Sequence, residues 1–292
     1  MSPYIFALLS NFSWGLGAQF YTFYSKKVSP VWVNIFKGTL GCILFGLTVI
    51  LTGGFSAIPI SAIGLFFLSG FIGLGFADTL FFKSFTGIGS SRTLIIVSFE
   101  TLLVGVMGYY FFGQQISAVK FLSIFFLIAC VFLFALESYK KTSKWNWQII
   151  LIALGGVVLD ALGVIATRAA FNISDAAPLE ANAYRCLGAV AAFAITAPVM
   201  KVRFFERINR MSSKALLGIT IGAIIGTYFA LLFHLTALKT GHLATIAAMS
   251  CTSVIFAAFF ECLFERKLPS KYLLAAIGLF LCAMYFLFVY HA

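Results

Sequence analysis

Long apolar runs separated by short polar segments dominate this chain of 292 residues. A membrane-spanning helix needs roughly 20 mostly apolar residues, and ten runs are long enough. They predict ten transmembrane helices over residues 3–24, 31–52, 60–82, 92–112, 117–138, 147–170, 179–200, 215–238, 242–264 and 269–290. The longest polar segment, 201–214, is too short for a separate domain. The pattern therefore predicts an all-α integral membrane protein.

Composition supports the same class. Only 10% of the residues are charged and 62% are apolar, whereas soluble proteins carry about 25% charged residues. The net charge of +11 does not indicate nucleic-acid binding, because the basic residues lie in short loops between apolar runs. Membrane proteins concentrate Lys and Arg in such loops.

The basic residues also predict an orientation. Of the 20 Lys and Arg residues, 15 lie in the loops that join predicted helices 1–2, 3–4, 5–6, 7–8 and 9–10. Loops rich in Lys and Arg face the cytoplasm. We therefore expect both termini on the non-cytoplasmic side, in a bacterial inner membrane.

A weak internal repeat divides the chain. Asn34 to Lys37 and Asn182 to Arg185 share the order Asn, apolar, aromatic, cation, 148 residues apart. The sequence predicts a five-helix repeat over 1–138, a basic linker over 139–146 and a second repeat over 147–292. Five helices are an odd number, so the second repeat must be inverted relative to the first. Inverted repeats typically form transporters whose solute site lies between the halves.

Ionisable residues inside the apolar runs are candidate functional groups, because a charge at the bilayer centre is costly. Lys37, Asp78 and Glu100 are predicted to share the inner half of the first repeat. In a functional interpretation, Glu100 takes up a proton, and Lys37 pairs with the Glu100 carboxylate after the proton has left. In a structural interpretation, an ion pair simply holds helices 2, 3 and 4 together.

The second repeat has a counterpart set. Arg185 is the repeat equivalent of Lys37, and the two cations could close opposite gates. Asp160, in the middle of helix 6, is a second candidate proton carrier. His234 titrates near neutral pH when unperturbed, but it could also be an interfacial residue near a helix end. Simple snorkelling to the interface is enough to explain three further residues: Arg168, Glu180 and Glu261.

Aromatic and small residues give two further expectations. Trp14, near the middle of helix 1, could line a cavity and bind a ring or cation, or it could only pack. Gly218, Gly222 and Gly226 form a stripe that should let another helix approach closely. Asn34 and Asn182 could form hydrogen bonds between helices and not contact a solute.

Several short motifs resemble the drug/metabolite transporter superfamily, in its ten-helix EamA-type branch. They are Trp14-Gly15, the turn from Ala237 to Ala244, and the turn from Leu263 to Pro269. Family members often carry Glu-Pro in helix 4 and a later Gly-Glu. This chain has Glu100-Thr101 and Gly113-Gln114 at those places. The resemblance implies secondary transport of amino acids, related metabolites or amphipathic drugs, often by proton exchange.

No nucleotide-binding motif, metal-ligand spacing or clustered catalytic set is present in the sequence, so we expect no enzyme activity, cofactor or metal. The leading prediction is a secondary transporter of a small organic metabolite, with protons and lipid as further partners and a monomer or homodimer as its state. The alternatives are a polyspecific exporter of aromatic cations and, from a different class, a membrane subunit or enzyme without transport activity.

Overall fold

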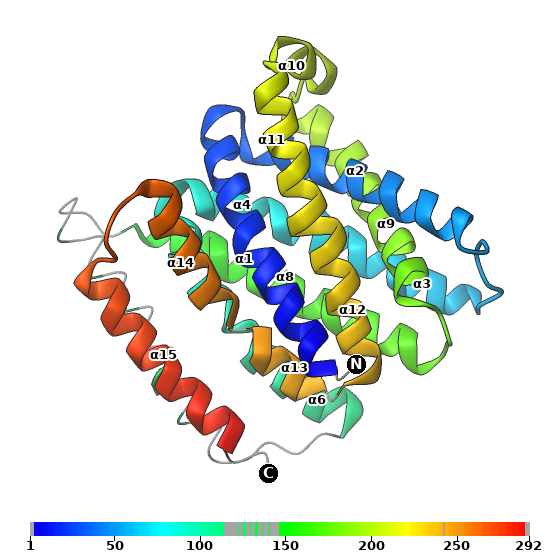
Figure 1. Cartoon of the computed structure of the whole chain (residues 1–292). Coiled ribbons are helices and arrows are strands. Elements are labelled where there is room, and N and C mark those ends of the chain that lie inside the picture. The colour runs from blue at the N-terminus through cyan, green and yellow to red at the C-terminus, as the bar shows by residue number, and fades with distance from the viewer. Residues whose placement is uncertain are drawn as a thin grey trace.

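The computed structural model describes residues 3–113, 146–241, 243–250 and 252–289, with isolated helical positions between 114 and 145 (Figure 1). Every regular element in these residues is helical, which confirms the predicted all-α class. The first half contains α1 (Pro3–Lys27), α2 (Pro30–Leu51), α3 (Ile60–Ser69), η1 (Gly70–Ala77), α4 (Asp78–Ile88), α5 (Ser90–Val97) and α6 (Glu100–Phe112). The second half contains α8 (Trp147–Asn172), α9 (Pro178–Val199), α10 (Phe204–Arg210), α11 (Ser213–Ala223), η2 (Ile224–Phe229), α12 (Ala230–Thr240), α13 (Leu243–Ser250), α14 (Thr252–Glu265) and α15 (Lys271–Val289).

Nine of the ten predicted spans correspond to described helices, and the span at 117–138 lies outside the described residues. Five described helices are long and apolar enough to cross a membrane without a break, or six when the bent pair α9 and α10 is included. The predicted loop at 201–214 was partly wrong, because it contains the short helix α10. The axis of α10 is bent 87° from that of α9, so α10 does not continue the span.

Helices 3 and 8 are present as predicted, but they are not α-helical throughout. Each contains a π-helical segment, η1 between α3 and α4 and η2 between α11 and α12. Such segments often occur at functional sites. Glycine makes the packing around η1 possible, since a Cβ atom on Gly70 would lie 1.7 Å from the backbone oxygen of Arg185.

Predicted helix 4 is also interrupted. In helix 4, α5 ends and α6 begins around Ser98 and Phe99. The amide of Phe99 bonds the carbonyl of Ile96 at 3.0 Å, a tight i to i−3 contact. The Ser98 hydroxyl also donates to the Leu94 carbonyl at 3.1 Å, and this kind of back-bonding often bends helices.

Several elements of the two halves correspond in length and order. Helices α2 and α9 both contain 22 residues and begin with a proline, Pro30 and Pro178, 148 positions apart. Helices α4 and α12 both contain 11 residues, and each follows a π-helical segment. The boundaries of the predicted repeats stay a prediction, but this correspondence identifies equivalent positions in the two halves.

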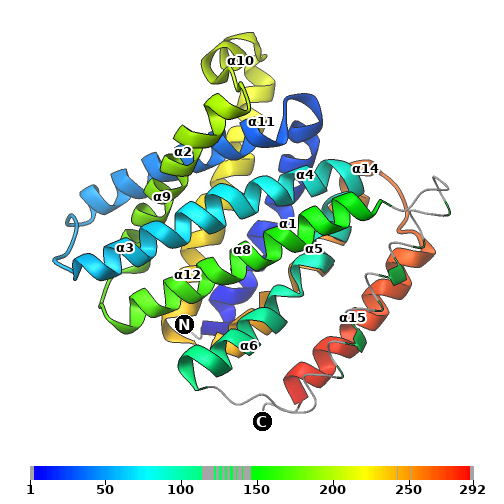
Figure 2. The ribbon, with the colours of Figure 1, turned by 180° about the vertical axis from the view of Figure 1, so that it is seen from behind.

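The halves are interlocked and do not lie side by side. Helix α1 packs against α11, η2, α12, α13 and α14 of the second half, while α8 packs against α3, η1, α4, α5 and α6 of the first (Figure 2). A Cβ atom on Gly17 of α1 would lie 2.4 Å from the Cα atom of Gly226. Gly218 and Gly222 of α11 face Tyr24 and Phe20 of α1, respectively. The predicted role of the glycine stripe in close packing is therefore confirmed.

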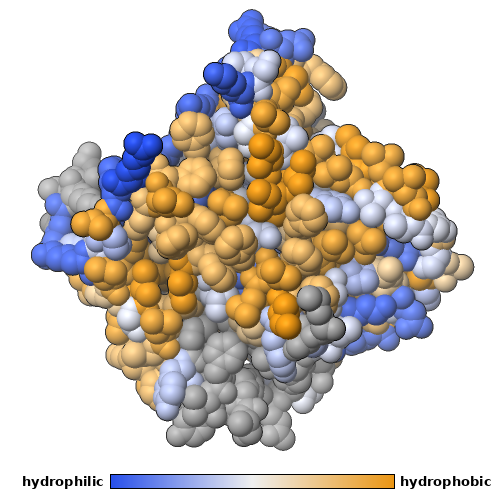
Figure 3. Space-filling view, in the orientation of Figure 1, coloured by the Kyte–Doolittle hydropathy of each residue, from blue (hydrophilic) through white to orange (hydrophobic). Residues whose placement is uncertain are grey.

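The molecular surface suits a bilayer. Large apolar side chains such as Leu47, Ile50, Leu151 and Phe259 are exposed, and apolar residues cover much of the face in Figure 3. Hydrophilic residues gather at the upper tip, where α10 lies. The first residues of α1 and the last residues of α15 lie in the lower half of Figure 1, away from α10. The protein is a multi-pass integral membrane protein.

Candidate functional site

A central cavity of about 100 Å³ lies between the two halves. Since one water molecule needs roughly 10–15 Å³ by this kind of measure, several waters or part of a small solute fit. All seven residues predicted as site candidates line it: Trp14, Lys37, Asp78, Glu100, Asp160, Arg185 and His234. Among the described residues, those that line the cavity lie in α1, α2, η1, α4, α5, α6, α8, α9, η2, α12, α13 and α14.

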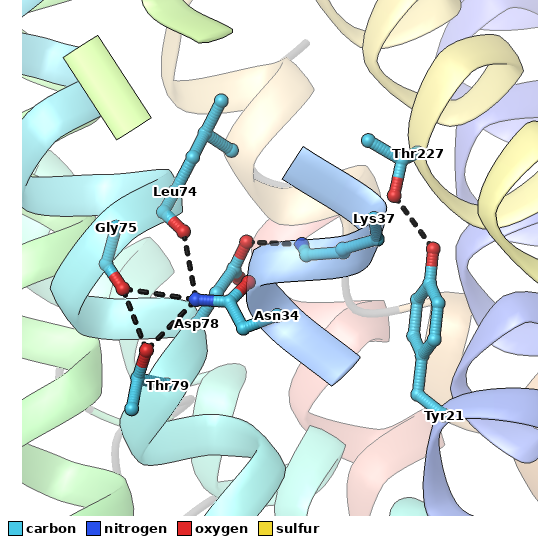
Figure 4. A network of polar contacts seen from close by, with 8 residues as sticks. All are labelled: Tyr21, Asn34, Lys37, Leu74, Gly75, Asp78, Thr79 and Thr227. Carbon is cyan, nitrogen blue, oxygen red and sulfur yellow. Dashed lines mark hydrogen bonds and ion pairs between the residues drawn. The ribbon is translucent and has the colours of Figure 1, made fainter. Parts of the chain in front are cut away.

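Lys37 forms a buried ion pair with Asp78 (Figure 4). Its Nζ atom also lies over three aromatic rings, 4.9 Å from the centroid of Phe82, 5.4 Å from that of Trp14 and 5.6 Å from that of Tyr21. Rings within about 6 Å attract a cation. The positive charge of Lys37 is therefore balanced inside the protein, and the predicted pairing of Lys37 with Glu100 does not occur.

Asp78 lies deeper than predicted. The predicted helix 3 ends at residue 82, close to Asp78, but the helix continues to Ile88. Asp78 is thus ten residues from the helix end, or roughly 15 Å at 1.5 Å per residue. At this depth a carboxylate needs a partner, which the ammonium group of Lys37 provides.

Asn34 fixes the position of η1 relative to α2. Its Nδ2 atom donates to the carbonyls of Leu74 at 3.1 Å and Gly75 at 2.9 Å, and lies 2.8 Å from the hydroxyl of Thr79. Asn182 acts in the same way in the second half, where Nδ2 donates to the Leu231 carbonyl at 3.0 Å. Both asparagines join helices, as expected.

Arg185 has a different environment from Lys37. Its Nε atom donates to the Ser69 hydroxyl at 3.1 Å, and that oxygen lies 2.6 Å from the Thr167 hydroxyl. Thr167 in turn donates to the Gly163 carbonyl at 2.9 Å. This chain of hydroxyl groups orients the guanidinium, but Nη1 is buried with no hydrogen-bond partner in the described structure.

Glu100 and Asp160 are the two other acids of the cavity. Glu100 is the first residue of α6, where the positive end of the helix dipole favours a negative charge. The Oδ1 atom of Asp160 lies 3.2 Å from the position that a Cβ atom on Gly73 would occupy, so this carboxylate rests against η1. Neither acid forms an ion pair or hydrogen bond within the described residues.

Trp14 and His234 complete the predicted set. Trp14 is half-buried on α1, with its ring centroid 6.2 Å from that of Tyr21. His234 is half-buried on α12 and lines the cavity, six residues before the helix ends at Thr240. This place favours the functional interpretation of the histidine over the interfacial one.

Sequence reasoning missed several small polar residues of the wall: Ser10, Thr227, Ser250 and Ser253. Thr227 accepts or donates a 2.6 Å hydrogen bond with the hydroxyl of Tyr21. Serine and threonine occur throughout the apolar runs, so their positions in the sequence do not indicate which of them line a cavity. The one available hint was that Thr227 directly follows the last glycine of the close-packed stripe.

Charges outside the cavity have structural partners. Glu180 is buried and accepts hydrogen bonds from the Ser56 amide at 2.7 Å and hydroxyl at 2.6 Å, so snorkelling was the wrong explanation. Arg168 donates to the carbonyl of Leu238 at 2.8 Å, near the end of α12. No group of His, Cys, Asp and Glu that could hold a metal ion occurs among the described residues.

Comparison with known proteins identifies the family. The model of the EamA-like transporter family matches residues 1–136 and again residues 147–289. The chain belongs to the EamA-like transporter family. This membership confirms the resemblance to the drug/metabolite transporter superfamily, and it favours transport over a non-transport subunit or an enzyme.

A solved structure supports the fold of this EamA-like transporter. A crystal structure with 12% sequence identity superposes with a TM-score of 0.71, over 99% of this chain and 96% of the other chain. No curated protein matches in a direct sequence comparison.

Proposed function

We propose that this EamA-like transporter is a secondary transporter of a small organic metabolite, an amino acid or a related compound, across a bacterial inner membrane. The observation that carries the proposal is the central cavity, because both halves contribute charged walls to it. Lys37 and Arg185 provide positive charge, and three acids provide negative charge. A cavity with both signs suits a solute that has both an ammonium and a carboxylate group.

Proton coupling is part of the proposal. Glu100 and Asp160 line the cavity without an ion-pair partner in the described residues. A carboxylate in the membrane interior is costly when charged and unpaired, so protonation offers a low-cost state when no solute cation is present. Alternating access between the interlocked halves would then link proton release on one side to solute movement.

Transport and charge movement in proteoliposomes test the proposal. Amino acids, sugars and organic cations would be applied with and without a pH gradient, and both current and radiolabelled counterflow would be recorded. We expect accumulation of at least one amino acid that depends on the pH gradient. Absence of both current and counterflow for every compound would contradict the proposed function.

One observation favours a second candidate function, the export of aromatic cations. The two unpaired carboxylates and the ring of Trp14 face the same cavity, and both kinds of group attract organic cations. The Glu100→Gln variant separates the candidates. A cation exporter should lose binding of an aromatic cation outright, whereas a metabolite carrier should retain binding and lose only proton coupling.

A further inference from the structure

The two repeat-related cations of the cavity are not balanced in the same way. Lys37 and Arg185 are each the eighth residue of a 22-residue helix, α2 and α9. Both are buried and both line the cavity. Lys37 is paired with the carboxylate of Asp78, whereas Arg185 has only the neutral Ser69 hydroxyl as a hydrogen-bond partner in the described structure.

The repeat shows which residue stands in place of the missing acid. Asp78 is the first residue of α4, directly after η1, and Ala230 is the first residue of α12, directly after η2. The asparagines of the two repeats also bond residues in this region of their halves. Asn34 bonds Thr79, the second residue of α4, and Asn182 bonds the carbonyl of Leu231, the second residue of α12.

Ala230 has a methyl group where its counterpart has a carboxylate. Ala230 and its neighbour Leu231 both line the cavity, as does Arg185. Space that Asp78 fills in the first half is therefore part of the cavity in the second half. A buried guanidinium with an unsatisfied nitrogen is costly, and the cost is removed when an anion occupies that space.

We propose that Arg185 and Ala230, at the start of α12, form the binding subsite for the carboxylate of the transported solute. This carboxylate lies beside Arg185 as the carboxylate of Asp78 lies beside Lys37. This inference rests on the proposed function, and it assigns the two cations different roles. Lys37 is a structural partner of Asp78, and Arg185 is a solute-binding residue. The hydroxyl chain through Ser69 and Thr167 holds the guanidinium ready for the anion.

The remaining acids of the cavity fit this arrangement. Neither Glu100 nor Asp160 forms an ion pair with Arg185 in the described residues. They leave the guanidinium free for an anion, and either acid alone is sufficient to receive an ammonium group, so a variant that loses one of them can still bind the solute. The solute class is then a compound with a carboxylate and a separate cationic group, and a solute without the carboxylate should bind more weakly.

Binding to the purified full-length protein in detergent tests the subsite. The probes are a panel of L-amino acids, each measured beside the amine that lacks its carboxylate, such as L-phenylalanine and 2-phenylethylamine. Arg185→Gln should weaken amino-acid binding about 10- to 100-fold, the usual effect of losing a hydrogen bond to a charged group. Binding of the matched amines should change much less. Equal losses for both members of each pair, or no binding of any amino acid to the unmodified protein, would overturn the subsite.

A second variant tests the subsite without removing Arg185. Ala230→Asp places a carboxylate where the repeat predicts one, so it should pair with Arg185, raise thermal stability and abolish amino-acid binding. Ala230→Asn is the matched control of similar size, and it should retain binding. If Ala230→Asp binds amino acids as tightly as the unmodified protein, the inference is wrong.

Binding and transport are measured separately, so the two proposals can fail separately. Arg185-dependent binding of amino acids without any uptake by proteoliposomes would support the subsite and contradict the transport proposal. Uptake of amino acids and their amines with equal KM, unchanged in Arg185→Gln, would support transport and contradict the subsite.

Discussion

Lys37 and Asp78 form a buried ion pair in the wall of the central cavity, and the ammonium group also contacts the rings of Trp14, Tyr21 and Phe82. The pair joins α2 to α4 at the point where η1 ends. It therefore connects Lys37, the first-half equivalent of Arg185, to a π-helical segment that borders the cavity.

The ion pair should show strong coupling in a double-mutant cycle. Removing one partner of a buried pair typically costs about 3–5 kcal/mol, because the other charge is left uncompensated. We expect Lys37→Met and Asp78→Asn each to lower the thermal unfolding temperature in detergent clearly. The double variant should lose less stability than the sum of the losses in the two single variants. Additive losses would show that the two charges do not depend on each other.

The sequence predicted the membrane class, the repeat and the cavity-lining charges, since charged residues are rare within apolar runs. It left the partner of Lys37 open between Asp78 and Glu100. The π-helical geometry of η1 shifts the faces of the following helix relative to a regular α-helix, so helical periodicity alone could not show that Asp78 faces α2. Nor could it show the hydroxyl partners of Arg185, because Ser69 and Thr167 look like many other small polar residues in the chain.

The contact between Gly17 and Gly226 should tolerate no side chain. A Cβ atom on Gly17 would lie 2.4 Å from a backbone atom of η2, and overpacking of this kind typically costs about 1–3 kcal/mol. Gly17→Ala should therefore lower the unfolding temperature and the yield of folded protein. Gly64→Ala is the matched control on α3, since its Cβ atom would meet nothing within 4 Å. Equal stability of the two variants would show that α1 and η2 can separate freely.

Neutralising Glu100 or Asp160 should uncouple transport from the pH gradient. Each side chain lines the cavity without an ion-pair partner in the described residues. In proteoliposomes, Glu100→Gln and Asp160→Asn should retain solute counterflow, which needs no net proton movement, and lose pH-driven accumulation. Glu206→Gln on α10 is the control, because this acid pairs with Arg203 and Arg210 at the surface. If both cavity variants still accumulate solute to the level of the control, the proton-carrier role is wrong.

The basic loops should face the cytoplasm. The α1–α2 turn, α10 and the α14–α15 turn carry many of the basic residues, and they lie on the side of the molecule away from the two chain ends in Figure 1. A reporter that is active only in the cytoplasm, fused after residue 292, should therefore be inactive. The same reporter fused within the segment 203–210 should be active. Strong activity of the first fusion would contradict the orientation.

Lys37 and Arg185 should bias the transporter in opposite directions when each is neutralised. They occupy equivalent positions in two halves that we predict to be inverted, so we expect them to lie toward opposite membrane faces, although only Lys37 has an acidic partner. A variant shifts the populations of two states by its differential effect on them, and the loss of a charge near one face should favour the opposite state from the loss of a charge near the other. A cysteine at Ser253, which lines the cavity, would be labelled with an impermeant maleimide from each side of oriented vesicles, in a background without the six native cysteines. Lys37→Met and Arg185→Met should increase labelling from opposite sides, and an increase from the same side for both would exclude opposite gates.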